Sequence, residues 1–196
     1  MGEIKSAFEI AMERTKGVTA DKESLEAENY KKEGKKIISN YLNEHDYTLD
    51  GCLNNYKDKQ LNWVKEGMFQ ALSSNFILPT DSYGVKECLK AAKGFYAIIS
   101  DTKMLNSILK QIESFFNEYI EQRKTVKINL EKQFAPRLKQ KQEEISRQLG
   151  GNVHLDPNSD PEFVKYLKHT YAQLEERYSQ ILIQVKNELK KMFDAG

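Results

Sequence analysis

Four side chains that could ligate a cation lie within one short segment. His154, Asp156, Asp160 and Glu162 fall between residues 152 and 162, and oxygen-rich loops suit Ca²⁺ or Mg²⁺. Their spacing matches no EF-hand, however, and the neighbouring prolines and Asn158 are typical of an ordinary turn. Asp160 also stands where it can cap a following helix. We therefore predict a structural turn without a bound metal, and a divalent-cation site is the alternative.

The chain carries none of the common motifs of catalysis or cofactor binding. Glycine-rich phosphate loops, the HExxH zinc motif and the GxSxG nucleophile elbow are absent. His45, His154 and His169 are scattered, and Cys52 and Cys88 form no CxxC pair, so neither a Cys–His pair nor a zinc site can be argued. The sequence therefore predicts no catalytic residue and no cofactor, and it favours a protein that is not an enzyme.

A basic stretch extends over residues 123–147, which contain eight cations and only three carboxylates. A long basic helix can follow a phosphate backbone, but these cations are spread around the helix and few aromatic side chains alternate with them. We expect a solvated face that glutamates of the last helix partly neutralise. Nucleic acid or another anionic partner is the alternative. The eight cations are Arg123, Lys124, Lys127, Lys132, Arg137, Lys139, Lys141 and Arg147.

Aromatic side chains gather in two parts of the sequence. Tyr166, Tyr171 and Tyr178 recur at helical spacing near the C-terminus, which indicates a core or a half-buried interface. Tyrosine is also enriched in protein–protein contacts, so we take these tyrosines, together with five of the cations, as candidate interaction residues. Those five are Arg123, Lys124, Lys127, Arg137 and Lys141. A second group could line a ligand site or simply fill a core, and it consists of Trp63, Phe69, Tyr83, Phe95 and Tyr96.

The composition is that of a helical protein. The 196 residues are 39% hydrophobic and 30% charged, with only 4 Pro and 10 Gly, and long helices tolerate so few turn residues where an all-β fold would not. The net charge of +1 provides no general attraction to nucleic acid or membrane. No apolar run approaches the ~20 residues that a membrane span needs. We expect a cytoplasmic protein.

Apolar periodicity predicts four helices in the first half of the chain. The first covers 3–16 and ends at Gly17, and the second begins after a cap at Asp21 and continues to about residue 42. A third is predicted over 52–76 and a fourth after Thr80-Asp81-Ser82. Together they form a base over residues 1–102.

The second half, residues 103–196, predicts a long antiparallel helical hairpin. An apolar stripe continues over 103–149, which corresponds to roughly 70 Å of helix, and Pro136 predicts a kink or a break near 132–135. Gly150-Gly151 ends this helix. Ser159-Asp160-Pro161-Glu162 begins the last one, whose apolar seam includes Tyr178, Ile181 and Val185. The short connector favours antiparallel neighbours.

Two segments resemble an uncharacterised family of bacterial helical proteins. They are the opening residues Met1-Gly2-Glu3-Ile4-Lys5-Ser6-Ala7-Phe8-Glu9 and the connector, with Leu155-Asp156-Pro157 and Asp160-Pro161-Glu162-Phe163. The resemblance implies a bacterial cytoplasmic protein and transfers no functional residue.

Taken together, these patterns predict an all-α protein that acts by binding. A long hairpin exposes apolar surface that one partner helix does not cover. We expect a scaffold or interaction protein that self-associates as a dimer through the hairpin, without a cofactor. The alternatives are a ligand-binding bundle or enzyme with a site among the base aromatics, and an anion-binding protein that uses residues 123–147.

Overall fold

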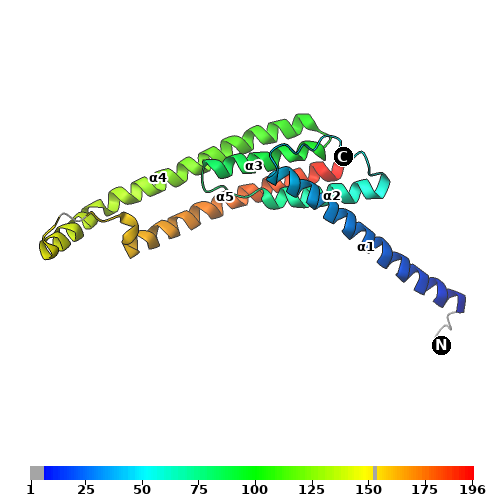
Figure 1. Ribbon diagram of the computed structural model, residues 1–196, viewed down its shortest axis with the longest axis horizontal. Coiled ribbons are helices and arrows are strands. Elements are labelled where there is room, and N and C mark those ends of the chain that lie inside the picture. Colours follow the sequence, from blue (N-terminus) through cyan, green and yellow to red (C-terminus); the bar gives the residue numbers. More distant parts are fainter. Residues whose placement is uncertain (1–6, 152–153) are drawn as a thin grey trace. The chain divides into compact units, whose positions relative to one another are not determined.

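The computed structural model describes residues 7–151 and 154–196, with side chains from Lys22 onward except Leu149. Over these residues the fold is all-α, as predicted, and contains no strand (Figure 1). The α-helices are α1 (Ala7–Asn43), α2 (Asp58–Asn75), α3 (Ser82–Gly94), α4 (Thr102–Leu149) and α5 (Pro161–Ala195). Two 3₁₀ turns, η1 (Phe95–Ala97) and η2 (Pro157–Ser159), complete the order.

The chain forms two compact units. The first consists of Met1–Phe76 with Lys90–Ser100, and the second of Ile77–Leu89 with Asp101–Gly196. Helix α3 therefore contributes its first residues to the second unit and its end to the first. No helix among the described residues has the length and apolar character to cross a membrane.

The prediction of two helices before residue 43 is wrong, because α1 is a single helix. It continues without interruption through Gly17 and Asp21 to Asn43, so the two helices predicted there are one, and the first half holds three α-helices. A glycine inside a helix costs only about 1 kcal/mol, which good helix formers on both sides can offset. Met1–Ser6 and the side chains of the proposed apolar face over 3–16 lie outside the described residues.

In the first unit, α1 crosses α2 at two glycines. A Cβ atom added to Gly34 would lie 2.1 Å from the Val64 carbonyl oxygen, and one added to Gly67 would lie 2.0 Å from that of Lys31. Real Cβ atoms do not approach a backbone oxygen so closely, so the two backbones touch only because both positions are glycine. The side chains of Ile38, Val64, Met68 and Leu72 are fully buried.

Polar and aromatic contacts flank this crossing. The indole of Trp63 stacks on the ring of Tyr30 at 6.1 Å, and the Tyr56 hydroxyl donates to the Glu33 carboxylate at 2.8 Å. The Lys31 ammonium pairs with Glu66 at 2.8 Å. Two of these contacts come from α2 and one from Tyr56, just before it, and together they orient this segment on α1.

Lys90 joins the end of α1 to the end of α3. Its Nζ donates to the carbonyl oxygens of Leu42 at 3.1 Å and Glu44 at 3.4 Å. Leu42 is one of the last residues of α1, whose carbonyls have no partner within the helix, and Glu44 follows the helix. In return, the Tyr41 hydroxyl donates to the Lys90 carbonyl at 3.0 Å. Each of the two residues thus donates a hydrogen bond to a backbone carbonyl of the other's helix.

In the second unit, α4 and α5 lie side by side and antiparallel (Figure 1). Position 123 pairs with 175, whereas position 141 pairs with 160, so residue numbers on α5 fall as those on α4 rise. Beyond the 123–175 pair, the ring of Tyr178 contacts those of Phe115 and Tyr119 at 5.1 and 4.9 Å.

Helix α4 contains Pro136 without a break, so the predicted break is wrong and the predicted kink stays a prediction. The helix begins at Asp101, whose carboxylate accepts from the Met104 amide at 2.9 Å. It ends at Gly150, which adopts the left-handed conformation with φ +69°, as predicted. The α5 seam differs at one place, because Leu182 is buried and Ile181 is 46% exposed.

Candidate interaction surface at the hairpin turn

The connector between α4 and α5 is organised by Asp156. Its Oδ1 accepts from the backbone and side-chain nitrogens of Asn158, both at 2.8 Å. The Ser159 hydroxyl donates to the Asp156 carbonyl at 2.6 Å. Aspartate favours such local bonds to the backbone two residues on, so the turn η2 forms from its own side chains.

Asp160 caps α5, as the sequence predicts. Its Oδ1 accepts from the amides of Glu162 at 2.9 Å and Phe163 at 3.3 Å, and Pro161 occupies the first helical position. The spacing of Ser159 and Glu162 also predicts a capping box, and this prediction is wrong. The Ser159 hydroxyl bonds within the turn, and the Glu162 carboxylate pairs with Arg137.

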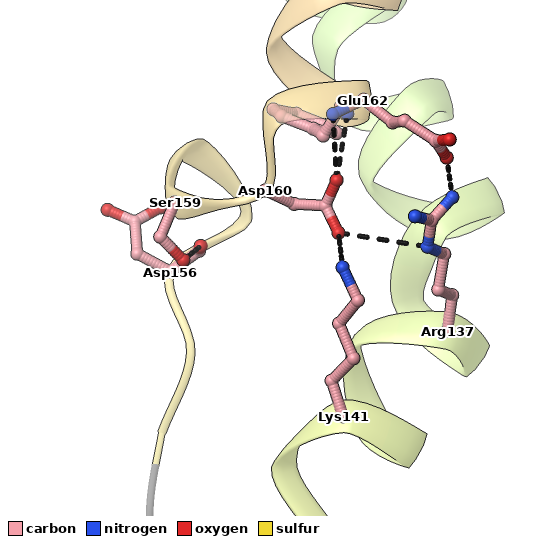
Figure 2. Close-up of polar contacts among 7 residues, drawn as sticks. Arg137, Lys141, Asp156, Ser159, Asp160 and Glu162 are labelled. Atoms are coloured by element: carbon pink, nitrogen blue, oxygen red, sulfur yellow. Dashed lines mark hydrogen bonds and ion pairs between the residues drawn. The ribbon is translucent and has the colours of Figure 1, made fainter. Parts of the chain in front are cut away.

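The same carboxylate anchors two cations of α4. Figure 2 shows that Lys141 and Arg137 are both directed at Asp160. The Lys141 Nζ lies 2.6 Å from the Asp160 Oδ2, and the Arg137 Nε lies 3.7 Å away. Asp160 is 3% exposed, and buried charges persist only when they are paired. The Asp160 Oδ1 therefore caps the N-terminus of α5, and the Oδ2 links this end of α5 to α4.

These contacts set the charge of Asp160. The hydrogen bond from Lys141 lowers the pKa of the Asp160 carboxyl, helped by the Phe163 amide and by the charge of Arg137, although desolvation opposes the change. A lower pKa keeps the carboxylate ionised at neutral pH. The ion pairs of Asp160 with Lys141 and Arg137 are consequently present at neutral pH.

The four predicted metal candidates do not converge. Asp156 serves the turn, Asp160 takes two cations and Glu162 pairs with Arg137. The exposed His154 lies with its Nδ1 3.3 Å from the Gln142 Nε2. Nowhere in the described parts of the chain do three or more metal-ligating side chains gather. The carboxylates of Asp160 and Glu162 thus bind lysine and arginine, and that of Asp156 binds Asn158.

Most cations of the basic stretch have a carboxylate partner. Arg123 pairs with Glu175 of α5 at 2.6 Å, and Arg137 and Lys141 pair with the start of α5. On α4 itself, Lys124 pairs with Glu121 at 2.6 Å and Lys127 with Glu131 at 3.9 Å. Only Lys132, Lys139 and Arg147 have no ion pair within the described residues. Three of the eight cations thus join α4 to α5 or to its cap.

The three candidate tyrosines of α5 have three different environments. Tyr178 is buried in the α4–α5 core. Tyr171 is half-buried, with the Arg123 guanidinium 4.1 Å above its ring and its hydroxyl donating to the Arg123 carbonyl at 3.4 Å. Tyr166 is 55% exposed. Of these three, Tyr166 is the one available to a partner.

Tyr166 lines a groove of about 320 Å³ between α4 and α5. Its ring lies 5.8 Å from that of Phe134, which itself meets the buried Phe163 edge-on at 5.6 Å. The Arg137–Glu162 ion pair lies at the rim. We call this the hairpin groove, and its lining residues are Leu130, Gln133, Phe134, Arg137, Glu162 and Tyr166.

Sequence reasoning missed Phe134, although a signal for it existed. Leu130 and Leu138 belong to the predicted stripe, and Phe134 stands midway between them at a spacing of four residues on each side. Residues four apart share one face of a helix. Extending the stripe through this position would have placed an aromatic ring opposite the beginning of α5.

The second group of aromatic residues is divided among several environments. Phe69 and Phe95 meet at 5.5 Å in the buried core of the first unit, whereas Trp63 stacks on Tyr30. Tyr83 is 72% exposed and belongs to the second unit. These four rings therefore have different environments, because helical spacing alone did not reveal which face each one occupies, and a ligand site among the base aromatics stays a prediction.

Comparisons with known proteins give a family but no activity. No curated protein and no solved structure matches the chain. A family model described as a family of unknown function, DUF6657, matches residues 50–191. This range covers well over half of the chain and includes α2 to α4 and nearly all of α5. The predicted membership of an uncharacterised family is thereby confirmed, and the chain belongs to the family DUF6657.

Proposed function

We propose that this chain is a non-enzymatic interaction protein that associates with a second copy of itself through the hairpin groove. The observation that carries the proposal is the exposure of Tyr166 above Phe134. An aromatic ring that is half open to water beside a second aromatic ring is the kind of anchor that dominates binding energy at protein interfaces.

The rim of the groove suits the same role. Arg137 and Glu162 lie beside the aromatic rings, and interfaces are enriched in tyrosine, phenylalanine and arginine. Arg137 is 43% exposed and Glu162 is 53% exposed at the side chain. Both can therefore exchange their mutual pair for a partner's charges at little cost, because exposed ion pairs contribute about 1 kcal/mol or less.

The charges of the rim favour a second copy as the partner. A two-fold axis brings the same patch of each protomer together, so residue i meets j while j meets i. The rim carries one cation and one anion, and two copies related in this way set Arg137 against Glu162 twice. The groove is thus self-complementary in charge.

Sedimentation velocity over a wide concentration range tests this proposal. We expect a monomer–dimer equilibrium, which Tyr166→Ala weakens by about 2 kcal/mol, or roughly 30-fold in the dissociation constant. Tyr83→Ala is the matched control, because Tyr83 is even more exposed and lies outside the groove. A wild-type protein that stays monomeric at the highest concentration, or a Tyr166→Ala protein that dimerises unchanged, contradicts the proposal.

Binding of nucleic acid along residues 123–147 receives less support. Five of the eight cations there already have carboxylate partners, and each must give up its partner before it neutralises a phosphate. Passage through a heparin column at low salt without retention is the expected result.

A further inference from the structure

The first unit contains an open pocket of about 500 Å³ beside the loop that follows α1. Three tyrosines contribute to its walls, namely Tyr41 from α1, Tyr47 from the loop and Tyr96 from η1. Pockets of 300–1,000 Å³ lined by aromatic side chains are typical of small-molecule sites. The sequence pattern gave no sign of this pocket, because its walls come from three separated segments.

The walls are fixed by contacts of their own. The Tyr41 hydroxyl donates to the Lys90 carbonyl at 3.0 Å, and the Lys90 ammonium lies 5.5 Å from the Tyr41 ring centroid. In the loop, Gly51 has φ +72°, a conformation that glycine adopts easily. The Asn54 amide then donates to the Gly51 carbonyl at 3.1 Å. The Tyr41 ring and the loop backbone at Gly51 are therefore held in place by contacts within the protein.

Two opposite charges also line the pocket. Lys93 and Asp50 are both exposed. Within the described part of the chain neither has an ion-pair partner, so they do not pair with each other. A ligand that carries an anionic and a cationic group can therefore meet Lys93 with one and Asp50 with the other, while its ring lies against the tyrosines.

We propose that this pocket binds a small zwitterionic aromatic molecule, of the class of the aromatic amino acids. The carboxylate lies at Lys93, the ammonium at Asp50 and the ring against the tyrosine walls. Three features of the pocket, a cation, an anion and an aromatic surface, match three features of one ligand class. This inference is independent of the hairpin groove, which lies in the other unit.

Isothermal titration calorimetry with a set of probes tests each feature on the full chain. L-phenylalanine carries all three groups, 3-phenylpropionate lacks the ammonium, phenethylamine lacks the carboxylate and L-leucine lacks the aromatic ring. We expect L-phenylalanine to bind most tightly. The two probes that lack a charged group should bind about tenfold more weakly, since a hydrogen bond to a charged group contributes about that factor, and L-leucine should bind more weakly because it loses the aromatic contact with the tyrosines.

Two variants separate the charges. Lys93→Met is expected to weaken binding of L-phenylalanine and 3-phenylpropionate about tenfold and to leave binding of phenethylamine unchanged. Asp50→Asn is expected to weaken binding of L-phenylalanine and phenethylamine about tenfold and to leave binding of 3-phenylpropionate unchanged. Both side chains are exposed, so folding is preserved. Lys35→Met, on the exposed part of α1 outside the pocket, is the matched control. Absence of heat with all four probes, binding of L-leucine equal to that of L-phenylalanine, or wild-type binding by Lys93→Met overturns the proposal.

Discussion

The α1–α2 crossing and the α4–α5 hairpin turn hold their helices together in opposite ways. At the crossing, two glycines bring backbone against backbone, and no space remains even for a methyl group. At the turn, the helices meet through long side chains, with Lys141 and Arg137 reaching from α4 to Asp160 at the start of α5. The crossing depends on the absence of a Cβ atom at two glycines, and the turn depends on long, flexible side chains.

This difference separates a rigid joint from an adaptable one. A backbone contact cannot be relieved by a change of rotamer, because the carbonyl oxygens of Lys31 and Val64 belong to helices. A lysine or arginine side chain, in contrast, can release one oxygen and find another. An adaptable joint next to an exposed aromatic groove suits a surface that rearranges when a partner binds.

The largest effect is expected from Gly67→Ala. The new Cβ would lie 2.0 Å from the Lys31 carbonyl oxygen, so α1 and α2 must separate, and overpacking of this kind costs about 3 kcal/mol or more. Urea unfolding followed by circular dichroism measures the loss. Gly151→Ala near the hairpin turn is the matched control, because nothing lies within 4 Å of its Cβ position. Equal stability of the two variants would contradict a backbone contact at the crossing.

A smaller effect, which depends on pH, is expected from Asp160→Asn. The asparagine keeps an oxygen for the α5 amides but loses the charge that Lys141 and Arg137 face. Because the pKa of Asp160 is lowered by folding from its ordinary 3.8, its contribution is complete above that value and is lost as the pH falls through the folded pKa.

Thermal unfolding from pH 7 down to pH 2 measures this contribution. Wild-type stability should exceed that of Asp160→Asn at neutral pH, and the two curves should converge in acid. Asp156→Asn is the control, since the hydrogen bonds of Asp156 with described residues lie within the turn. A constant difference across the whole pH range would show that the charge of Asp160 contributes nothing.

The smallest effect is expected from Tyr56→Phe at the crossing, at about 1 kcal/mol or less. Burial, together with the hydrogen bond to Glu33, raises the pKa of Tyr56 to about 12. The hydroxyl therefore stabilises the fold fully below pH 10 and loses this effect as the pH rises toward 12. The difference between Tyr56→Phe and wild type, measured by urea unfolding, should vanish in that range, and a difference that grows there would refute the bond to Glu33.

The sequence predicted those features that depend on local chemistry. Asp160 as a cap, Gly150 as a terminator and the antiparallel partners over 103–196 follow from rules that involve neighbouring residues. Gly17 misled, because glycine is a strong helix terminator only where the chain must turn, and here the helix continues. The glycines at 34 and 67 are invisible to periodicity, since what matters is the other backbone that each one meets.

The candidate site was predicted in part, for the same reason. The tyrosines of α5 and the cations of α4 were identified, but not which of them remain exposed. That distinction depends on partners such as Glu175 for Arg123 and Phe134 for Tyr166, each of which lies on the opposite helix. Pairing across a hairpin depends on its register, and an offset of a few residues changes every partner.

The exchange of bonds between Lys90 and the end of α1 has a consequence for local opening. The last turn of a helix ordinarily opens and closes independently of the rest of the protein. Here the acceptors of Leu42 and Glu44 are held by a side chain of α3, and the backbone of that same residue is held by Tyr41. Amide protons at the two helix ends should therefore exchange with solvent at a common rate, as parts of one cooperative unit.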